Sequence, residues 1–250
     1  MIVLTCEHAS NTVPARYRAL FDAGLSGDAG GRDTGPEVLS THRGYDIGAL
    51  VVARHLEKLL DAPLFSGRVT RLLVDLNRSA GNPSVFSPFS RALPMAARAR
   101  LLHAYHAPFR AAVRERIEAM LREAPQVWHI SVHSHTPELD GKVRNNAVGI
   151  LYDPARHGEV GLAVALQTAL RERQRSWHIR FNYPYRGTGD GHVTALRAAF
   201  SAGRYIGIEL EINQRLLSNA RAARTVASLL GETLVEVLPG RTLARRGSLG

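Results

Sequence analysis

Short apolar segments rich in β-branched residues alternate along this chain with longer amphipathic segments, and this alternation constrains the fold more than any other feature. Such alternation is typical of α/β domains, in which helices cover a parallel or mixed sheet. We expect strands over residues 2–6, 72–76, 127–132, 148–152 and 205–211. We expect helices over residues 46–60, 94–122, 159–173 and 220–237. The sequence therefore predicts an α/β fold.

The chain of 250 residues can bury the core of one large domain, and no repeat or linker divides it. The single cysteine, Cys6, excludes an intramolecular disulfide and favours a reducing, cytoplasmic setting. No apolar run reaches the roughly 18 residues that span a bilayer, and the first residues lack the charged region of a signal peptide. We expect a cytoplasmic monomer or small homo-oligomer without a membrane partner. Its domain should cover residues 1–240, followed by a basic tail at 241–250.

The formal net charge is +10, from 32 basic and 22 acidic residues. An excess of this size favours an anionic partner, which includes nucleic acid. The arginines are spread over the predicted helices, aromatic residues make up only 6%, and there is no zinc-finger spacing. We therefore expect a small anionic partner rather than nucleic acid. A non-catalytic nucleic-acid-binding protein is the alternative from another class.

Polar side chains follow three of the predicted strands at the point where each strand ends. Glu7-His8 follows the first strand, Asn77-Arg78 the second, and residues 133–135 the third. In open α/β sheets, ligands bind outside the carboxyl ends of the strands. The sequence therefore predicts one shared cleft at this edge of the sheet.

Histidines and one aspartate are candidate metal ligands. A neutral imidazole is the commonest zinc ligand, so His8 and His133 are candidates, each with a structural alternative as a turn cap or a solvent-facing loop histidine. His135 lies on the same side as His133 if the strand continues, so one can bind metal while the other contacts the substrate. Asp46 occupies an expected helix N-cap, and it can instead supply a carboxylate to the site.

Two glutamates on the last predicted strand are candidates for acid–base chemistry. Glu209 and Glu211 share one face of that strand. A carboxylate beside an activated water is the general base that amide hydrolysis needs. The alternative is a half-exposed strand with a polar outer face.

Arginines and one asparagine are candidates for binding a carboxylate. A planar guanidinium grips a carboxylate with two hydrogen bonds, and an adjacent amide adds another donor, so Asn77-Arg78 is a candidate anchor. Arg71 and Arg144 are candidates for a second carboxylate. Structural salt bridges are the alternative role for each arginine.

A set of short segments follows a fixed order along residues 3 to about 217. These segments are residues 6–11 with Pro14, His42 with Asp46 and residues 48–49, residues 75–78, residues 132–134 with 136–137, residues 148–152, and residues 207–209 with Glu211 and Gln214. Taken together, they resemble the N-formylglutamate amidohydrolase family. Their order is also similar to that of zinc carboxypeptidases and acylamino-acid deacylases.

This resemblance implies a single-domain three-layer sandwich around a central mixed, mostly parallel sheet, the phosphorylase/hydrolase-like architecture of zinc carboxypeptidases. It implies one zinc ion held by His8 and His133, and hydrolysis of N-formyl-L-glutamate to formate and L-glutamate. The His-x-x-Glu pair of carboxypeptidases is broken, because Asn11 stands where they have glutamate. Amide oxygen is a poor zinc ligand beside a carboxylate, so we expect Asp46 rather than Glu7 as the third ligand.

By the same resemblance, Asn77-Arg78 holds the substrate carboxylate, and Glu211 is the base with Glu209 as the second choice. His135 stands where many relatives carry an aromatic residue. Residues 182–191 resemble a segment that covers the substrate. The nearest alternative is a deacylase or carboxypeptidase that acts on another carboxylate-bearing amide.

Overall fold

Apolar segments from three distant parts of the sequence form the adjacent central strands of one sheet. In the computed structural model, which describes residues 1–22 and 35–238, six strands pair in the order β2-β1-β3-β8-β6-β7. The strands in that order are β2 (Leu64–Ser66), β1 (Ile2–Cys6), β3 (Val127–His135), β8 (Tyr205–Asn213), β6 (Val148–Leu151) and β7 (Ile179–Phe181). β6 pairs antiparallel with β8, and the other four pairings are parallel. The expected mixed, mostly parallel sheet is confirmed.

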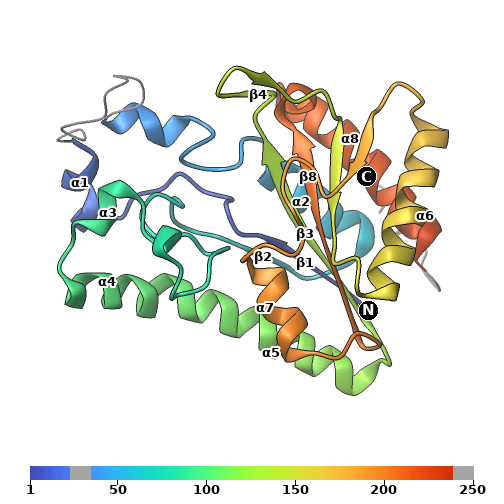
Figure 1. Cartoon of the computed structure of the whole chain (residues 1–250), viewed down its shortest axis with the longest axis horizontal. Helices are drawn as coiled ribbons and strands as arrows, with labels where there is room; N and C mark the ends of the chain where they lie inside the picture. Colours follow the sequence, from blue (N-terminus) through green and yellow to red (C-terminus); the bar gives the residue numbers. More distant parts are fainter. Residues whose placement is uncertain (23–34, 239–250) are drawn as a thin grey trace, which may run out of the picture.

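Helices cover both faces of the sheet and complete the three layers, with α6 and α8 on one side and α5 and α7 on the other (Figure 1). The helices are α1 (Ala19–Asp22), α2 (Ala49–Leu60), α3 (Pro88–Arg91), α4 (Met95–Leu101), α5 (Ala107–Glu123), α6 (His157–Arg173), α7 (His192–Ala199) and α8 (Ala220–Val237). A small hairpin joins β4 (Glu138–Leu139) to β5 (Lys142–Val143). None of the helices in the described part of the chain is long and apolar enough to cross a membrane.

The two faces of the central strands differ because successive side chains point to opposite sides of a sheet. Even-numbered residues such as Leu4, Ile130 and Ile208 join the main core with α2, α6 and α8. On the other face, Val3 and Tyr205 pack with α5 and α7. Further along this second face, the buried side chains become polar. Hydrophobic burial therefore anchors the start of each strand, and the polar ends form the floor of a site.

The register brings these polar residues side by side. Ser131 pairs with Glu209, and His133 pairs with Glu211, across β3 and β8. β3 continues to His135, so His133 and His135 share a face, as expected. The side chains of all five residues are buried: Ser131, His133, His135, Glu209 and Glu211. The alternatives of solvent-facing histidines and of a half-exposed β8 are therefore wrong.

Residues 72–76 do not form a strand, which corrects the prediction for this segment. The chain turns there, because the Leu73 amide donates to the Thr70 carbonyl and the Arg78 amide donates to the Asp75 carbonyl. Leu73 and Val74 instead pack in a separate apolar cluster beside α4. A short apolar run indicates that a segment is buried, but burial alone does not distinguish a strand from a buried turn.

Other boundaries differ in ways that matter for the site. The expected helix over 94–122 is interrupted by a π-helical turn, Leu102–His106. α2 begins at Ala49 with Gly48 as its N-cap, so Asp46 lies outside the helix and its side chain is free for another role. Sequence reasoning missed β2, β7 and α7. The predicted basic tail at 241–250 lies outside the described residues.

Candidate active site

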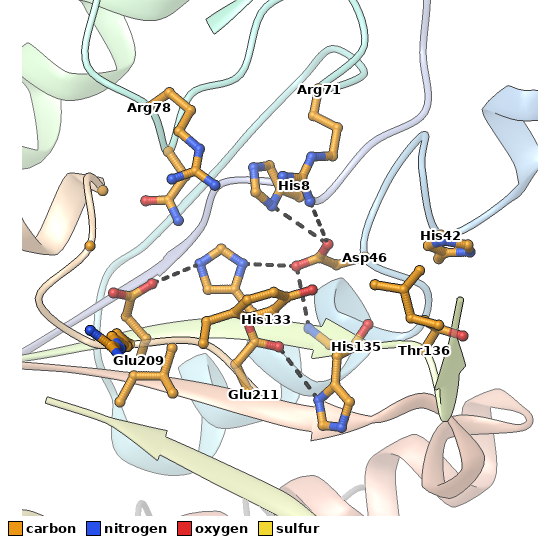
Figure 2. Close-up of a pocket in the computed structure, with 18 of the residues that line it drawn as sticks. His8, His42, Asp46, Arg71, Arg78, His133, His135, Thr136, Glu209 and Glu211 are labelled. Atoms are coloured by element: carbon orange, nitrogen blue, oxygen red, sulfur yellow. Dashed lines mark hydrogen bonds and ion pairs between the residues drawn. The ribbon is translucent and has the colours of Figure 1, made fainter. Parts of the chain in front are cut away.

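A cavity of about 470 Å³ opens where the polar ends of β1, β3 and β8 meet (Figure 2). All the predicted site residues line it except Arg144. Those that do are His8, Asp46, Arg71, Asn77, Arg78, His133, His135, Glu209 and Glu211. The single cleft expected from the strand ends is therefore present. Asn77 and Arg78 reach it from a turn rather than from a strand.

Three buried side chains in this cavity form a candidate metal centre. One donor atom from each of His8, Asp46 and His133 lies within 4.8 Å of the others. The His133 Nδ1–H donates to Asp46 Oδ2 at 2.8 Å, and His8 Nδ1 lies 3.5 Å from Asp46 Oδ1. Figure 2 shows the three side chains directed toward one another. Two imidazoles and a carboxylate form a donor set that suits zinc.

His8 is held from behind by a carboxylate that sequence reasoning did not assign. Its Nε2–H donates to Asp75 Oδ1 at 2.8 Å, which leaves Nδ1 directed into the site. Among the described residues, this buried Nδ1 has no hydrogen-bond partner. Histidines that bind metals usually donate their other ring N–H to such a carboxylate. The arrangement therefore fits a metal ion bound through Nδ1.

His133 is held in a similar way by a buried chain of hydrogen bonds. Its Nε2 lies 3.0 Å from Ser131 Oγ, and Ser131 Oγ–H donates to Glu7 Oε2 at 2.8 Å. The other oxygen of Glu7 accepts from His192 Nδ1 at 3.0 Å. Glu7 thus lies on the Nε2 side of His133, away from Asp46. It is not part of the three-residue cluster, which supports the preference for Asp46 as third ligand.

The buried charges of the cluster are mutually stabilised. Burial raises the pKa of Asp46, but the charge of His8 and the hydrogen bond from His133 outweigh it and hold this pKa well below its ordinary value. Burial lowers the pKa of His133, yet the hydrogen bond to Asp46 raises it to about 10. Without a metal, His133 therefore carries two ring protons beside an ionised Asp46.

Arg71 contacts two carboxylates at the candidate metal centre. Its Nη2 donates to Asp75 Oδ2 at 3.0 Å, and its Nη1 lies 3.6 Å from Asp46 Oδ1. Burial raises the pKa of Asp75, but His8 and Arg71 together hold that pKa well below its ordinary value. The structural salt bridge that was the alternative for Arg71 is present, at a position that also lines the cavity.

The two glutamates of β8 lie at different places along the cavity floor. Glu209 Oε2 is 3.6 Å from His133 Nε2, on the side away from Asp46 (Figure 2). Glu211 Oε2 is 3.5 Å from His135 Nδ1 and has no hydrogen-bond partner within the described ranges. Burial, with Glu7 and Glu211 nearby, raises the pKa of Glu209 despite the opposing His133. Both residues line the cavity.

The turn at Asn77-Arg78 is fixed to the segment before α7. The Arg78 Nη1 donates to the Asp190 carbonyl at 2.8 Å, and the Asn77 Oδ1 accepts from the His192 amide at 2.7 Å. The Asp190 carboxylate in turn accepts from the Ser79 amide at 3.0 Å. The guanidinium of Arg78 is thus held at the cavity wall. That position is compatible with binding an anion.

Arg144 is placed differently from the expectation. It does not line the cavity, and its guanidinium lies 5.3 Å from the ring centroid of Tyr185, which does. Two arginines that sequence reasoning did not select, Arg43 and Arg186, line the cavity instead. Tyr185 and Arg186 belong to the segment expected to cover the substrate. Their position beside the cavity agrees with that expectation.

Sequence reasoning also missed Asp75, Ser131 and His192. Asp75 offered a signal, because a carboxylate inside an apolar run must have a partner when it is buried. Ser131 offered a weaker one, since it lies two residues before His133 on the same strand face. His192 directly follows the predicted covering segment, but no local pattern indicated its contact with Glu7.

Comparisons with solved structures show that other proteins share this fold. The N-formylglutamate amidohydrolase of Ralstonia eutropha JMP134 superposes with a TM-score of 0.63 at 19% identity, over 94% of this chain and 92% of that one. A gene product from Agrobacterium tumefaciens superposes with a TM-score of 0.78 at 30% identity, over 94% of this chain and 89% of that one. A comparison with curated proteins finds no significant match.

The profile of the N-formylglutamate amidohydrolase family matches residues 1–218. The chain therefore belongs to that family, and the resemblance noted from its motifs is confirmed. Membership places it among enzymes that hydrolyse amides.

Proposed function

We propose that this protein is a zinc-dependent amidohydrolase that cleaves N-formyl-L-glutamate to formate and L-glutamate. The observation that carries the proposal is the His8 Nδ1, which is buried beside Asp46 and His133 and has no hydrogen-bond partner within the described residues, in a cavity that Glu211 also lines. A buried nitrogen without a partner costs free energy, and a bound cation would remove that cost. Family membership supports the reaction class.

His8, Asp46 and His133 would hold the ion. Zinc supplies Lewis-acid activation of water and of the acyl carbonyl. Asp75 keeps the His8 Nε2 protonated, so that Nδ1 presents its lone pair. Ser131 and Glu7 orient His133 from its opposite side.

Glu211 is the proposed general base. Glu211 lines the cavity, and its carboxylate can accept the proton of the attacking water. The same carboxyl then delivers that proton to the nitrogen of the leaving amine, so formate and a free amino group result. Glu209 is the second candidate, since it lines the same cavity and burial raises its pKa above the ordinary value.

The arginines of the cavity support a substrate with more than one carboxylate. Asn77-Arg78 would hold the α-carboxylate. Arg71 is already paired with Asp75 and Asp46, so Arg186 is better placed than Arg71 for a side-chain carboxylate. Arg144 would act through Tyr185, which it contacts. A small anionic N-acyl amino acid in the cytoplasm is the proposed partner, with no role for nucleic acid.

Metal analysis combined with turnover tests the proposal. We expect stoichiometric zinc in the purified protein, hydrolysis of N-formyl-L-glutamate, and loss of both in His133→Ala. A panel of N-acetyl, N-succinyl and peptide substrates separates this activity from that of a deacylase or carboxypeptidase. The mechanism would be contradicted if the wild type carried no stoichiometric metal and the His133→Ala variant hydrolysed the substrate as well as the wild type does. Turnover of peptides alone would contradict the substrate, and chelation-resistant, salt-sensitive nucleic-acid binding without turnover would favour the non-catalytic alternative.

A further inference from the structure

A π-helical turn lies against the Asn77-Arg78 turn, outside the residues assigned to the reaction. The turn is Leu102–His106, and the Ala107 amide donates to the Leu102 carbonyl five residues earlier. Pro108 follows directly and has no amide hydrogen for the α-helical ladder. π-helical turns within α-helices occur frequently at functional sites. We therefore expect the π-helical turn Leu102–His106 to have a functional role.

The π turn directs His106 at the backbone of Arg78. His106 is buried, and its Nε2 lies 2.8 Å from the Arg78 carbonyl. A carbonyl only accepts hydrogen bonds, so His106 carries its proton on Nε2 and donates it. Burial lowers the pKa of His106, which keeps the ring neutral.

Arg110, one helical turn further on, acts on the same segment. Its Nη1 donates to the carbonyls of Leu76 and Arg78, at 3.2 Å in each case. Residues four apart lie on the same face of a helix, so His106 and Arg110 present their donors together. Two side chains thus hold the backbone carbonyl of Arg78. We call this pair the π-turn clamp.

The clamp holds the Arg78 backbone, whereas Asp190 holds its side chain. The Arg78 guanidinium donates to the Asp190 carbonyl, and the neighbouring Ser79 amide donates to the Asp190 carboxylate. Fixing both the backbone and the side chain of Arg78 leaves the guanidinium little freedom. A preorganised guanidinium loses less entropy when it binds a carboxylate.

We propose that His106, assisted by Arg110, is a positioning residue that sets the affinity for the substrate α-carboxylate through Arg78. This inference rests on the proposed function, because it assumes that Arg78 binds that carboxylate. His106 does not line the cavity, so its effect on substrate is indirect. A merely structural histidine would instead change the stability of the fold and leave KM as it is.

Steady-state kinetics of N-formyl-L-glutamate hydrolysis test the clamp with three variants. His106→Leu removes the donor at similar volume, and we expect KM to rise about tenfold with kcat within about twofold, the change expected when binding alone is weakened. His106→Gln can place an amide N–H near the former Nε2, and we expect it to restore most of the affinity. His103→Leu is the matched control, since His103 is exposed in the same π turn and should give wild-type values.

A double-mutant cycle tests the route through Arg78. In an Arg78→Ala background, we expect His106→Leu to add no further rise in KM, because the side chain that it positions is gone. Arg110→Met supplies a second measurement if His106→Leu is poorly folded, and we expect it to raise KM in the same direction.

The possible failures are distinguishable. A folded His106→Leu or Arg110→Met with wild-type KM would overturn the clamp and leave the proposed function intact. If His106→Leu raised KM as much in the Arg78→Ala background as in the wild type, the route through Arg78 would be overturned. Absence of turnover by the wild type would overturn the proposed function and the clamp together.

Discussion

At the scale of single residues, the candidate metal centre depends on side chains that do not face the metal position. Asp75 fixes the ring of His8, and Ser131 fixes the ring of His133. Each imidazole therefore has one nitrogen occupied and the other directed at Asp46. Arg71 balances the charge of the two aspartates. Precise ligand orientation of this kind comes from the surrounding hydrogen bonds.

Asp75→Asn should weaken zinc binding by about 10- to 100-fold. The amide keeps the shape of the carboxylate but removes the charge that favours a protonated Nε2 and a basic Nδ1 on His8. Competition with a chromophoric chelator measures the affinity. Asp153→Asn is the matched control, since Asp153 does not line the cavity and its side chain accepts from the Ala155 amide. Equal zinc affinity in Asp75→Asn and the wild type would contradict the orienting role of Asp75.

His129 makes the stability of the protein depend on pH. It is fully buried between the hydroxyls of Thr5 and Tyr205, at 2.8 and 2.7 Å from its ring nitrogens. Burial lowers its pKa to about 3, whereas the unfolded chain has an ordinary value near 6.5. Below about pH 6.5 the unfolded state therefore binds a proton that the folded state does not. The contribution of His129 to stability is complete above that pH and is lost as the pH falls toward 3.

Urea unfolding at pH 7 and pH 5 measures this effect. We expect the wild type to lose about 2 kcal/mol of unfolding free energy to His129 between the two pH values. The glutamine of His129→Gln cannot titrate. The unfolding free energy of this variant should therefore fall by about 2 kcal/mol less than that of the wild type over the same interval. The exposed His103→Gln should follow the wild type. Identical pH dependence in His129→Gln and the wild type would show that His129 is protonated at pH 5 in the folded protein as in the unfolded chain.

At the scale of elements, close backbone approach fixes β6 beside the covering segment. Gly149 lies opposite Glu211 in the antiparallel pairing of β6 with β8. A β-carbon at Gly149 would come within 1.8 Å of the Tyr183 carbonyl oxygen. Only glycine allows the segment before Tyr185 to lie this close to the sheet.

Gly149→Ala should destabilise the fold by about 1–3 kcal/mol, because the backbone at Tyr183 must move to admit the methyl group. Gly161→Ala is the matched control. Gly161 is an exposed residue inside α6 with open space around it, so its replacement should stabilise the helix by up to about 1 kcal/mol. Denaturant unfolding compares the two variants. A Gly149→Ala protein as stable as Gly161→Ala would mean that the covering segment adapts freely.

At the scale of the whole molecule, the site joins segments that are far apart in sequence. His8 follows β1, Asp46 precedes α2, and His133 lies in β3. Parallel pairing of β1 with β3 and of β3 with β8 brings these segments to one edge. Four arginines and four carboxylates line the cavity, so the net charge of +10 is carried by residues outside it. Charge of this sign attracts small anionic substrates as well as polyanions.

Local sequence determined much of the fold. Short apolar runs rich in β-branched residues identified β1, β3 and β8, and the amphipathic segments at 159–173 and 220–237 identified α6 and α8 nearly to the residue. Short elements such as β7 were missed, because three residues carry too little periodic signal. Residues 72–76 were misassigned since buried turns and strands have the same apolar composition.

The sequence by itself also predicted most of the residues that meet in the cavity, because polar residues at the ends of parallel strands lie at one edge of the sheet. Only the tertiary structure decided how they are used. It set Asp46 against His133 instead of at a helix N-cap, turned Glu7 away from the cluster, and moved Arg144 behind Tyr185. Strand periodicity fixes which face a side chain occupies. Which of its atoms meets which partner depends on contacts between residues more than 60 positions apart, as between His8 and Asp75, and no local pattern encodes those contacts.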